Sequence, residues 1–357
     1  MYNVGILASC LAMCFAANPS KRLIEFGWDE PDTAFMREHI AEMEKTPFDG
    51  CVFHLNYRDE DGSTGSFTWE CWGKKKFTEE QLKGAVDDLR NTLFQRFTHN
   101  FLRFNVTPGD VDWFDDFSAV LSNAKLAAKV AKQGGVKGIL FDIEQYNSAL
   151  FNYSQQRDSS TKSFSEYARQ VRKRGNQLME AFQSEYPNIT IFLTFGYCLP
   201  WVQMGGEKKL EEVHYGLLAP LLDGMVDGAN GESVIVDGGE LAYSYKDTSR
   251  FATTYKMMTE DVLKIVANPQ KYKSVFSLGF GVWMDNGWRR EGWNTKNFEN
   301  NFYTPEAFEA TLSTALKTSD EYVWIYTETP RWWTASGKPE KLPQEYVKAV
   351  WRALKKE

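Results

Sequence analysis

Strand-like segments alternate with helical patterns along almost the whole chain, from residue 22 onward. The strand-like segments are short and apolar, whereas the segments between them carry apolar residues at helical spacing. Strands are expected at residues 23–28, 48–55, 100–106, 136–146, 188–197, 233–236, 274–284 and 321–327. Because a helical pattern follows each strand, consecutive strands can run parallel in one sheet. Eight such units predict an α/β fold, the closed (β/α)8 or TIM barrel, with long βα loops.

The chain of 357 residues contains no linker, no low-complexity segment and no repeat beyond the βα unit. Residues 22–357 are therefore expected to form a single catalytic barrel domain. The chain is longer than the roughly 250 residues typical of such a barrel. Long loops are expected to hold the surplus, at residues 56–77, 147–162 and 287–303.

Residues 1–17 form a segment of a different kind, with an apolar run followed by small residues. This pattern is typical of a secretory signal peptide, so the protein is expected to be secreted or periplasmic. A buried first strand in a cytoplasmic protein is the alternative. The stretch Leu7-Ala8-Ser9-Cys10 also resembles a lipobox, which would make the protein a lipoprotein.

Composition excludes several classes of function. The formal net charge is -7 and no basic stripe occurs, so nucleic acid is not an expected partner. No later stretch approaches the ~20 apolar residues of a transmembrane helix. Glycine-rich nucleotide-binding motifs are absent and the four histidines lack zinc-site spacing, so we expect no cofactor and no histidine-based metal site. The sequence leaves the oligomeric state open.

Three cysteines remain after residue 17, namely Cys51, Cys71 and Cys198. None of them forms a C-x-x-C pair. A disulfide between Cys51 and Cys71 and a set of buried free thiols are both compatible with this pattern.

The fourth predicted strand delivers two carboxylates at its end, Asp142 and Glu144. Side chains alternate across a strand, so these two acids share a face with Leu140, while Phe141 points the other way. In a parallel barrel this strand end opens to solvent, and active sites lie there. Two acids on one face are therefore expected to have a catalytic role. The structural alternative is a salt bridge to Arg103 or Lys137.

The other strand ends contribute mainly carboxylates and aromatic rings. The catalytic candidates are the acids at the fourth, sixth and eighth strand ends, namely Glu144, Asp142, Asp237 and Glu328. The candidates for substrate binding are Trp28, Asp29, His54, Arg103, Tyr146, Tyr197, Trp283, Asp285, Trp324 and Tyr326. Cleavage of a glycosidic bond needs a proton donor and a second carboxylate, and sugar rings stack on aromatic side chains. The ring of candidates therefore favours a glycoside hydrolase that acts on an oligo- or polysaccharide.

Two resemblances to barrel-type glycoside hydrolases follow from these residues. Asp142-Ile143-Glu144 resembles the Asp-x-Glu ending of the chitinase-like enzymes, which implies that Glu144 is the general acid and that Asp142 orients the substrate. Asp142 and Asp237 also match the positions of the nucleophile and the acid in barrels of the α-galactosidase and α-glucosidase type. Glu144 is the preferred proton donor, and Asp237 and Glu328 are the candidates for the second carboxylate.

Two other functions are compatible with the same residues. A barrel that keeps the stacking rings but lacks a working catalytic pair would be a carbohydrate-binding protein. Alternatively, the carboxylates would hold Mg²⁺ or Ca²⁺ in a metal-dependent hydrolase or lyase. The sugar, the anomer and the stereochemical outcome are not determined by the sequence.

Overall fold

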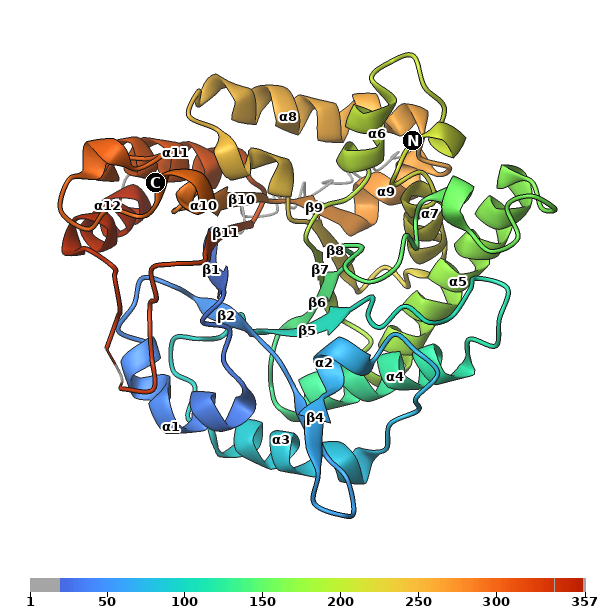
Figure 1. Cartoon of the computed structure of the whole chain (residues 1–357), viewed down its shortest axis with the longest axis horizontal. Coiled ribbons are helices and arrows are strands. Elements are labelled where there is room, and N and C mark those ends of the chain that lie inside the picture. The colour runs from blue at the N-terminus through green and yellow to red at the C-terminus, as the bar shows by residue number, and fades with distance from the viewer. Residues whose placement is uncertain (1–19, 337, 356–357) are drawn as a thin grey trace, which may run out of the picture.

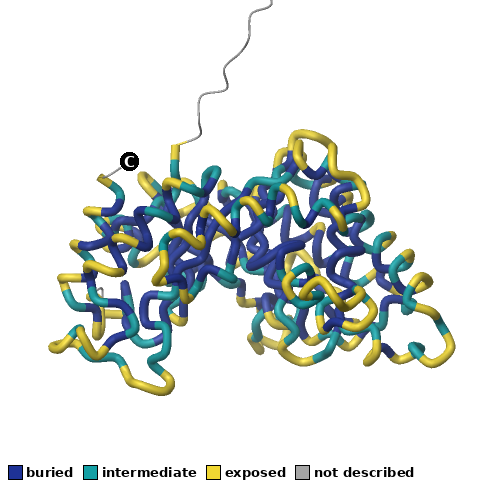
Figure 2. Tube along the Cα trace, turned by 90° about the horizontal axis from the view of Figure 1, so that it is seen from above, coloured by how far each residue is buried: buried dark blue, intermediate teal, exposed yellow. Residues whose placement is uncertain are grey.

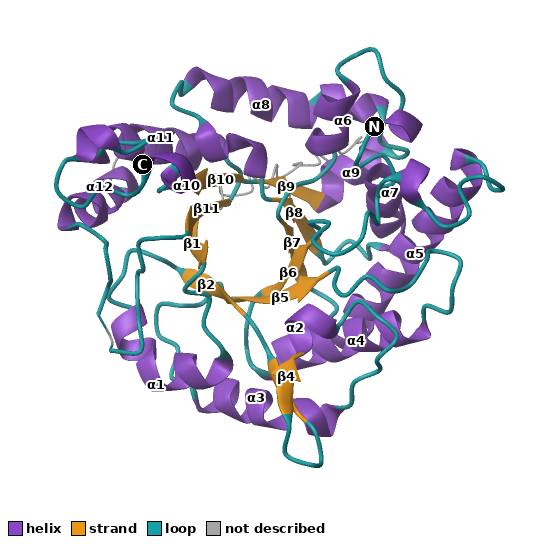
Figure 3. Ribbon diagram, viewed as in Figure 1, coloured by secondary structure: helices purple, strands orange, loops and turns teal. Residues whose placement is uncertain are grey.

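The computed structural model describes residues 20–336 and 338–355, and the expected leader at residues 1–17 lies outside this range. Parallel strands form a barrel at the centre and helices surround it (Figures 1 and 3). The strands follow one another in the order β10, β11, β1, β2, β5, β6, β7, β8 and β9. Their bounds are β1 Arg22–Gly27, β2 Gly50–Phe53, β5 Phe101–Asn105, β6 Gly138–Asp142, β7 Thr190–Leu193, β8 Val234–Asp237, β9 Phe276–Leu278, β10 Phe280–Trp283 and β11 Tyr322–Thr327.

β9 and β10 are two halves of one barrel strand, separated by Gly279. β9 pairs with β8 and β10 pairs with β11, so together they close the circle of eight. A Cβ atom on Gly279 would lie 2.7 Å from the Tyr322 carbonyl oxygen, so glycine permits the close approach at this break. The predicted (β/α)8 barrel is confirmed.

Two layers of apolar side chains hold the barrel together, as the alternation of side chains along each strand dictates. Inward-facing residues such as Ile24, Leu140 and Trp324 fill the interior. Outward-facing residues such as Ile139 and Phe141 pack against the helices. Figure 2 shows the resulting buried centre and the exposed periphery.

A helix follows each barrel strand and covers the outside of the sheet (Figure 3). The covering helices are α1 Thr33–Met43, α3 Glu79–Asn91, α4 Ser118–Gln133, α5 Phe164–Glu185, α7 Leu218–Gly228, α8 Ser249–Thr259, α11 Pro305–Thr318 and α12 Gln344–Leu354. The remaining elements lie in the loops, namely β3 Asn56–Arg58, β4 Thr64–Ser66, α2 Phe67–Glu70, η1 Tyr153–Gln155, α6 Cys198–Met204, η2 Leu210–Glu212, η3 Glu240–Ser244, η4 Asp261–Lys264, α9 Pro269–Val275, α10 Trp288–Glu291 and η5 Phe298–Asn300.

The predicted boundaries fail where loop elements intervene. The seventh strand begins at Phe276 rather than at 274, because Asn268 caps a short helix, α9, that ends at Val275. The loop expected at 56–77 contains the antiparallel hairpin β3–β4 and helix α2. After β7 the helical segment is divided into η2 and α7.

The three cysteines of the described chain, Cys51, Cys71 and Cys198, are buried free thiols. Of the two states left open by the sequence, the structure therefore has the free thiols. No helix within the described residues is long and apolar enough to cross a membrane.

Candidate active site

A cavity of about 700 Å³ opens at the carboxyl ends of the barrel strands. Residues from seven of the eight βα units line it, namely Phe26, Gly27, Trp28, Glu30, His54, Asn56, Ser66, Trp69, Arg103, Glu144, Tyr146, Glu240, Tyr243, Trp283, Arg289, Tyr326 and Glu328. Five large apolar side chains stand exposed among the described residues, and three of them line this cavity: Trp28, Trp69 and Tyr146. Exposed aromatic rings are thus concentrated at the mouth of the barrel.

Glu144 and Glu240 form a pair of interacting carboxyl groups in the cavity. Glu144 follows β6, and Glu240 begins η3 after β8. Burial, and after it the charge of Asp142, raise the pKa of Glu144 to about 7. Burial raises the pKa of Glu240 well above its ordinary value, and the charges of Glu144 and Asp142 raise it further. Both carboxyl groups therefore hold a proton more tightly than an ordinary glutamate does, and the charge of one disfavours ionisation of the other.

The surroundings of the two groups differ. Oε2 of Glu240 is buried and accepts no hydrogen bond from any described residue. Glu144 lies near Arg103 and Tyr146, both of which lower its pKa and so favour its ionised form. The proton of the pair is therefore favoured on Glu240 and the negative charge on Glu144.

A buried ion-pair network supports this carboxyl pair from the side of β5. Arg103 donates to Asp142 Oδ2 through Nε (3.1 Å) and Nη2 (2.6 Å), and to Glu30 Oε2 through Nη1 (2.7 Å). Tyr146 donates to the same Asp142 oxygen at 3.0 Å. Burial alone would raise the pKa of Glu30, but Arg103 and His54 hold it below its ordinary value. The guanidinium carbon lies over two aromatic rings, 5.1 Å from the centroid of Phe26 and 4.9 Å from that of Trp69.

Glu328 lies on the other side of the cavity, after β11. Arg289 donates to both of its carboxylate oxygens, and the Tyr326 hydroxyl donates to Oε1 at 3.1 Å. The Trp288 indole donates to Oε2. This carboxylate is fully occupied by donors, so it has no free lone pair positioned for proton transfer and instead fixes the orientation of α10 beside the cavity.

Aromatic rings form two walls. Trp69 and Tyr146 lie with their ring centroids 5.4 Å apart on one side. On the other side Tyr243 stacks on Tyr326, with centroids 5.4 Å apart and an interplanar angle of 19°, and Trp283 packs edge-on against both. Flat apolar rings beside carboxylates provide both stacking surfaces and hydrogen-bonding groups for a sugar.

The structure brings most of the predicted site residues together. Those that line the cavity are Glu144, Glu328, Trp28, His54, Arg103, Tyr146, Trp283 and Tyr326. The others lie behind its walls or outside the barrel, namely Asp142, Asp237, Asp29, Tyr197, Asp285 and Trp324.

Asp142 does not open to solvent as the sequence implied. It is completely buried, and it holds Arg103 in the salt bridge that was the structural alternative. Glu144 lies two residues beyond the end of β6 and lines the cavity, and it forms no salt bridge with any described residue. The two neighbouring acids therefore have different surroundings.

Asp237 faces away from the cavity. Val236 points into the barrel, so the next side chain of β8 points out between barrel and helices. There Asp237 accepts a hydrogen bond from the Gly239 amide at 3.1 Å and lies 3.7 Å from Cys198 Sγ. Burial raises its pKa to about 6.

Four predicted binding residues also lie behind the walls. Asp29 turns toward the loop after β11, where it accepts from the Trp332 amide at 2.7 Å. Tyr197 donates to Asp223 of α7 at 2.9 Å, outside the barrel. Asp285 accepts from the Trp283 indole and from the backbone amides of residues 328 and 329. Trp324 lies deeper in the barrel and donates to the Gly238 carbonyl at 2.7 Å.

The sequence places Glu240 among the carboxylates at the strand ends, but it was not chosen as a catalytic candidate. Gly238 and Gly239 come between β8 and this acid, and Gly239 has a positive φ of 59°. A Cβ on Gly238 would lie 2.3 Å from the Leu193 carbonyl oxygen. The glycine pair thus permits a tight turn that returns the chain to the mouth, and an acid directly after Gly-Gly was the available signal.

Four further cavity residues were not among the predicted site residues for a different reason, namely Glu30, Trp69, Tyr243 and Arg289. Each comes from a loop or a short loop helix whose path is set by tertiary contacts. Glu30 lies just before α1, but Asp32 is the N-cap of that helix and leaves Glu30 free to bind Arg103.

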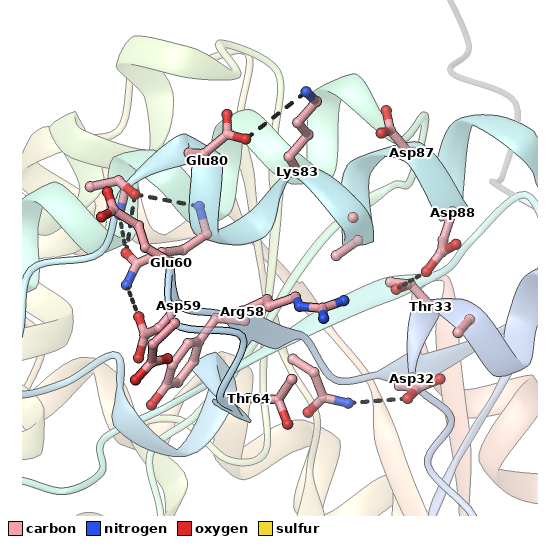
Figure 4. A pocket seen from close by; sticks show the side chains of 18 of the residues that line it. Asp32, Thr33, Arg58, Asp59, Glu60, Thr64, Glu80, Lys83, Asp87 and Asp88 are labelled. Carbon is pink, nitrogen blue, oxygen red and sulfur yellow. Dashed lines mark hydrogen bonds and ion pairs between the residues drawn. The ribbon is translucent and has the colours of Figure 1, made fainter.

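A larger and more open groove of about 1260 Å³ lies beside the barrel, between the β3–β4 hairpin, the start of α1 and α3 (Figure 4). Charged side chains dominate it, and several pair within it, as Glu80 does with Lys83 at 4.0 Å. Tyr57, which is buried, is the only aromatic residue that lines it. Among the described residues that line it, the groove therefore has no exposed aromatic ring and no buried carboxyl oxygen without a hydrogen-bond partner.

Within residues 20–336 and 338–355, no three His, Cys, Asp or Glu side chains are grouped so that they could hold a metal ion.

Comparison of the sequence with protein-family models and with curated proteins finds no match. Solved structures with a similar fold exist. A GH5-4 broad-specificity endoglucanase from an uncultured bacterium has a TM-score of 0.49 at 10% identity, over 90% of this chain and 86% of that chain. An endocellulase from the archaeon Pyrococcus horikoshii has a TM-score of 0.45 at 9% identity, over 92% and 87%. For a putative chitinase A from Streptomyces coelicolor the values are 0.40 and 11%, over 94% and 99%.

These neighbours have the names of glycoside hydrolases. At such identities the similarity concerns the arrangement of strands and helices, and it assigns no substrate and no residue role to this chain.

Proposed function

We propose that the protein is a glycoside hydrolase that cleaves an oligo- or polysaccharide with the carboxyl pair Glu144 and Glu240. The observation that carries the proposal is the buried Oε2 of Glu240, which has no hydrogen-bond partner among the described residues, in a cavity that Glu144 and exposed aromatic rings also line. Breaking an acetal needs a proton for the leaving oxygen and a negative group for the oxocarbenium-like transition state. In this pair the protonated carboxyl group supplies the proton, and the ionised carboxylate supplies the negative charge.

The roles follow from the surroundings of each group. Glu240, whose buried Oε2 has no donor among the described residues and whose pKa burial raises well above its ordinary value, is the group that protonates the leaving oxygen. Glu144, close to Arg103, is the group that ionises and supports the positive charge of the transition state, as nucleophile or as base for water. This assignment moves the proton from Glu144, the donor favoured by the sequence, to Glu240.

Asp142, Arg103 and Glu30 are positioning residues in this mechanism. Their ion pairs link β5, β6 and the loop after β1 beneath the reacting groups. The aromatic walls hold the sugar rings, and Glu328 with Arg289 fixes the wall on the side of α10.

The test is hydrolysis of a panel of natural glycans by the parent protein and by the Glu240→Gln and Glu144→Gln variants. Turnover by the parent that falls by at least a hundredfold in each variant is the expected result, because acid–base groups contribute about 10²- to 10⁴-fold. Glu232→Gln is the matched control, since this acid is exposed and precedes β8. Binding of a glycan without any turnover would instead make the protein a carbohydrate-binding barrel.

We also propose that the protein is exported, on the basis of the apolar leader at residues 1–17. Expression with a reporter enzyme fused after residue 22 tests this, because the reporter should appear outside the cytoplasm only when the leader is intact.

A further inference from the structure

A second hollow, here called the side hollow, lies next to the active-site cavity. Its volume is about 420 Å³, and the loops after β1 and β11 form its walls together with the first turn of α1. The residues that belong to it alone among the two spaces include Phe35, Arg331, Trp333, Thr334 and Glu340. The side hollow is open at the surface, so a ligand that leaves the cavity can enter it.

The two spaces adjoin, because Trp28, Glu30 and His54 line both. Glu30 and His54 are held in place by their contact, with Nδ1 of His54 3.5 Å from Oε1 of Glu30. Trp28, which also lines both spaces, has 64% of its surface exposed. The exposed ring of Trp28 lies between the two spaces. Covering such a ring with a flat apolar surface removes it from water and lowers the free energy.

Like the cavity, the side hollow is lined by both aromatic rings and hydrogen-bonding side chains. It combines ring surfaces of Phe35 and Trp28 with hydrogen-bonding groups of Arg331, Thr334 and Glu340. Nη1 of Arg331 has no hydrogen-bond partner among the described residues. Rings and polar groups at close quarters suit the faces and the hydroxyl groups of a sugar.

We propose that one linear oligosaccharide occupies both spaces, with one sugar beside Glu144 and Glu240, a sugar stacked on Trp28 and the next sugar in the side hollow. The substrate is then a glycan chain longer than a disaccharide. The part of the chain outside the cavity is bound mainly by the stacking of a sugar on the Trp28 ring. The inference rests on the proposed function, because it assumes that the cavity takes a sugar.

The test is kcat/KM for linear oligomers of one sugar, lengthened by one unit at a time from the disaccharide. In the parent, kcat/KM should rise with length and then level off. In Trp28→Ala the ratio of kcat/KM for the longest to the shortest oligomer should fall about tenfold, whereas Trp28→Tyr, which keeps a ring, should retain most of the ratio. Thr334→Trp, which fills the side hollow, should lower the ratio as well.

Val202→Ala is the control, because Val202 is an exposed apolar residue of α6 that lines neither space. Its ratio should equal that of the parent. Two results would overturn the proposal. One is a ratio near one in the parent, and the other is a kcat/KM in Trp28→Ala that is lowered equally for every oligomer length.

A binding measurement separates this inference from the reaction. Calorimetric titration of the same oligomers into a protein with both Glu144→Gln and Glu240→Gln should show affinity that rises with length and is lost in Trp28→Ala. Length-dependent affinity together with a parent that cleaves nothing would contradict the hydrolase and support the spanning glycan. Affinity that does not change with the length of the oligomer would overturn the inference.

Discussion

At the scale of single residues, Glu240 is a group whose function costs stability. Its pKa is raised in the fold, so between the ordinary value and the raised value the folded protein retains a proton that the unfolded chain releases. The Glu240 carboxyl group therefore does not change the free energy of unfolding at a pH below its pKa in the unfolded chain, and it lowers the free energy of unfolding at a pH above that pKa. We predict that Glu240→Gln raises the free energy of unfolding at pH 7.5 by on the order of 1–2 kcal/mol, with the gain vanishing near pH 4.

Urea unfolding at both pH values measures this difference, and the exposed Glu232→Gln should show no gain at either. A Glu240→Gln variant that is equally stable or less stable at pH 7.5 would show that the carboxyl group ionises without cost in the fold.

Asp142 sets the pH range in which Glu144 is ionised. Its charge adds to burial in raising the pKa of Glu144 to about 7, so replacing it with a neutral side chain should lower that pKa. In the proposed mechanism Glu144 acts when ionised, and its titration forms the acidic limb of the pH dependence of kcat/KM. Asp142→Asn should therefore move this limb to lower pH by about one unit, which corresponds to about 1.4 kcal/mol. An unmoved limb, or one moved to higher pH, would contradict the role of Asp142.

Arg103 neutralises two buried carboxylates at once, Glu30 and Asp142. Removing the guanidinium leaves both without a counter-charge in the interior, which typically costs about 3–5 kcal/mol. Arg103→Met keeps much of the apolar stem, so the decrease in the free energy of unfolding measured in urea should reflect the missing charge. A matched change at Arg22→Met, whose ion pair with Asp49 is half-exposed, should cost about 1 kcal/mol or less. Equal losses for the two variants would contradict the account.

At the scale of elements, α5 and α7 approach so closely that glycine is required on both helices. A Cβ on Gly175 would lie 2.1 Å from the Leu221 carbonyl oxygen, and one on Gly224 would lie 1.9 Å from the Arg172 carbonyl oxygen. Glycine to alanine within a helix ordinarily stabilises by about 1 kcal/mol. At Gly175 we predict the opposite sign, a loss of about 2 kcal/mol or more, because the helices must separate.

Gly84 of α3 is the matched control, since nothing lies within 4 Å of its Cβ position. Gly84→Ala should raise the thermal midpoint while Gly175→Ala lowers it. Changes of the same sign in the two variants would show that the contact between α5 and α7 is not as tight as described.

The elements were also the part of the structure that the sequence predicted best. Strand and helix patterns are local, because the periodicity of apolar residues decides which face is buried. The eight βα units follow from them, and so does the placement of Glu144 and Tyr146 at one strand end. Gly279 shows the limit, since a break between β9 and β10 depends on the neighbouring strand β11 rather than on the local pattern.

At the scale of the whole molecule, closing the barrel is what assembles the site. It brings Glu144 after β6 and Glu240 after β8 to one mouth, although about a hundred residues separate them in sequence. The face that each side chain presents at a strand end could not be predicted with equal success. Asp237 and Glu240 lie close together in sequence, yet one faces the helices and the other the cavity, because the turn at Gly239 decides the direction.

The central claim is that Glu240 delivers the proton and that Glu144 carries the charge. The most direct measurement is the rate of hydrolysis of aryl glycosides as a function of the pKa of the leaving phenol, in the parent and in both glutamine variants. If Glu240 is the donor, Glu240→Gln should recover near-parent rates with the most acidic phenols and lose activity steeply as the phenol becomes less acidic. Glu144→Gln should stay slow with every phenol. Recovery in Glu144→Gln rather than in Glu240→Gln would contradict the assignment and return the proton to Glu144.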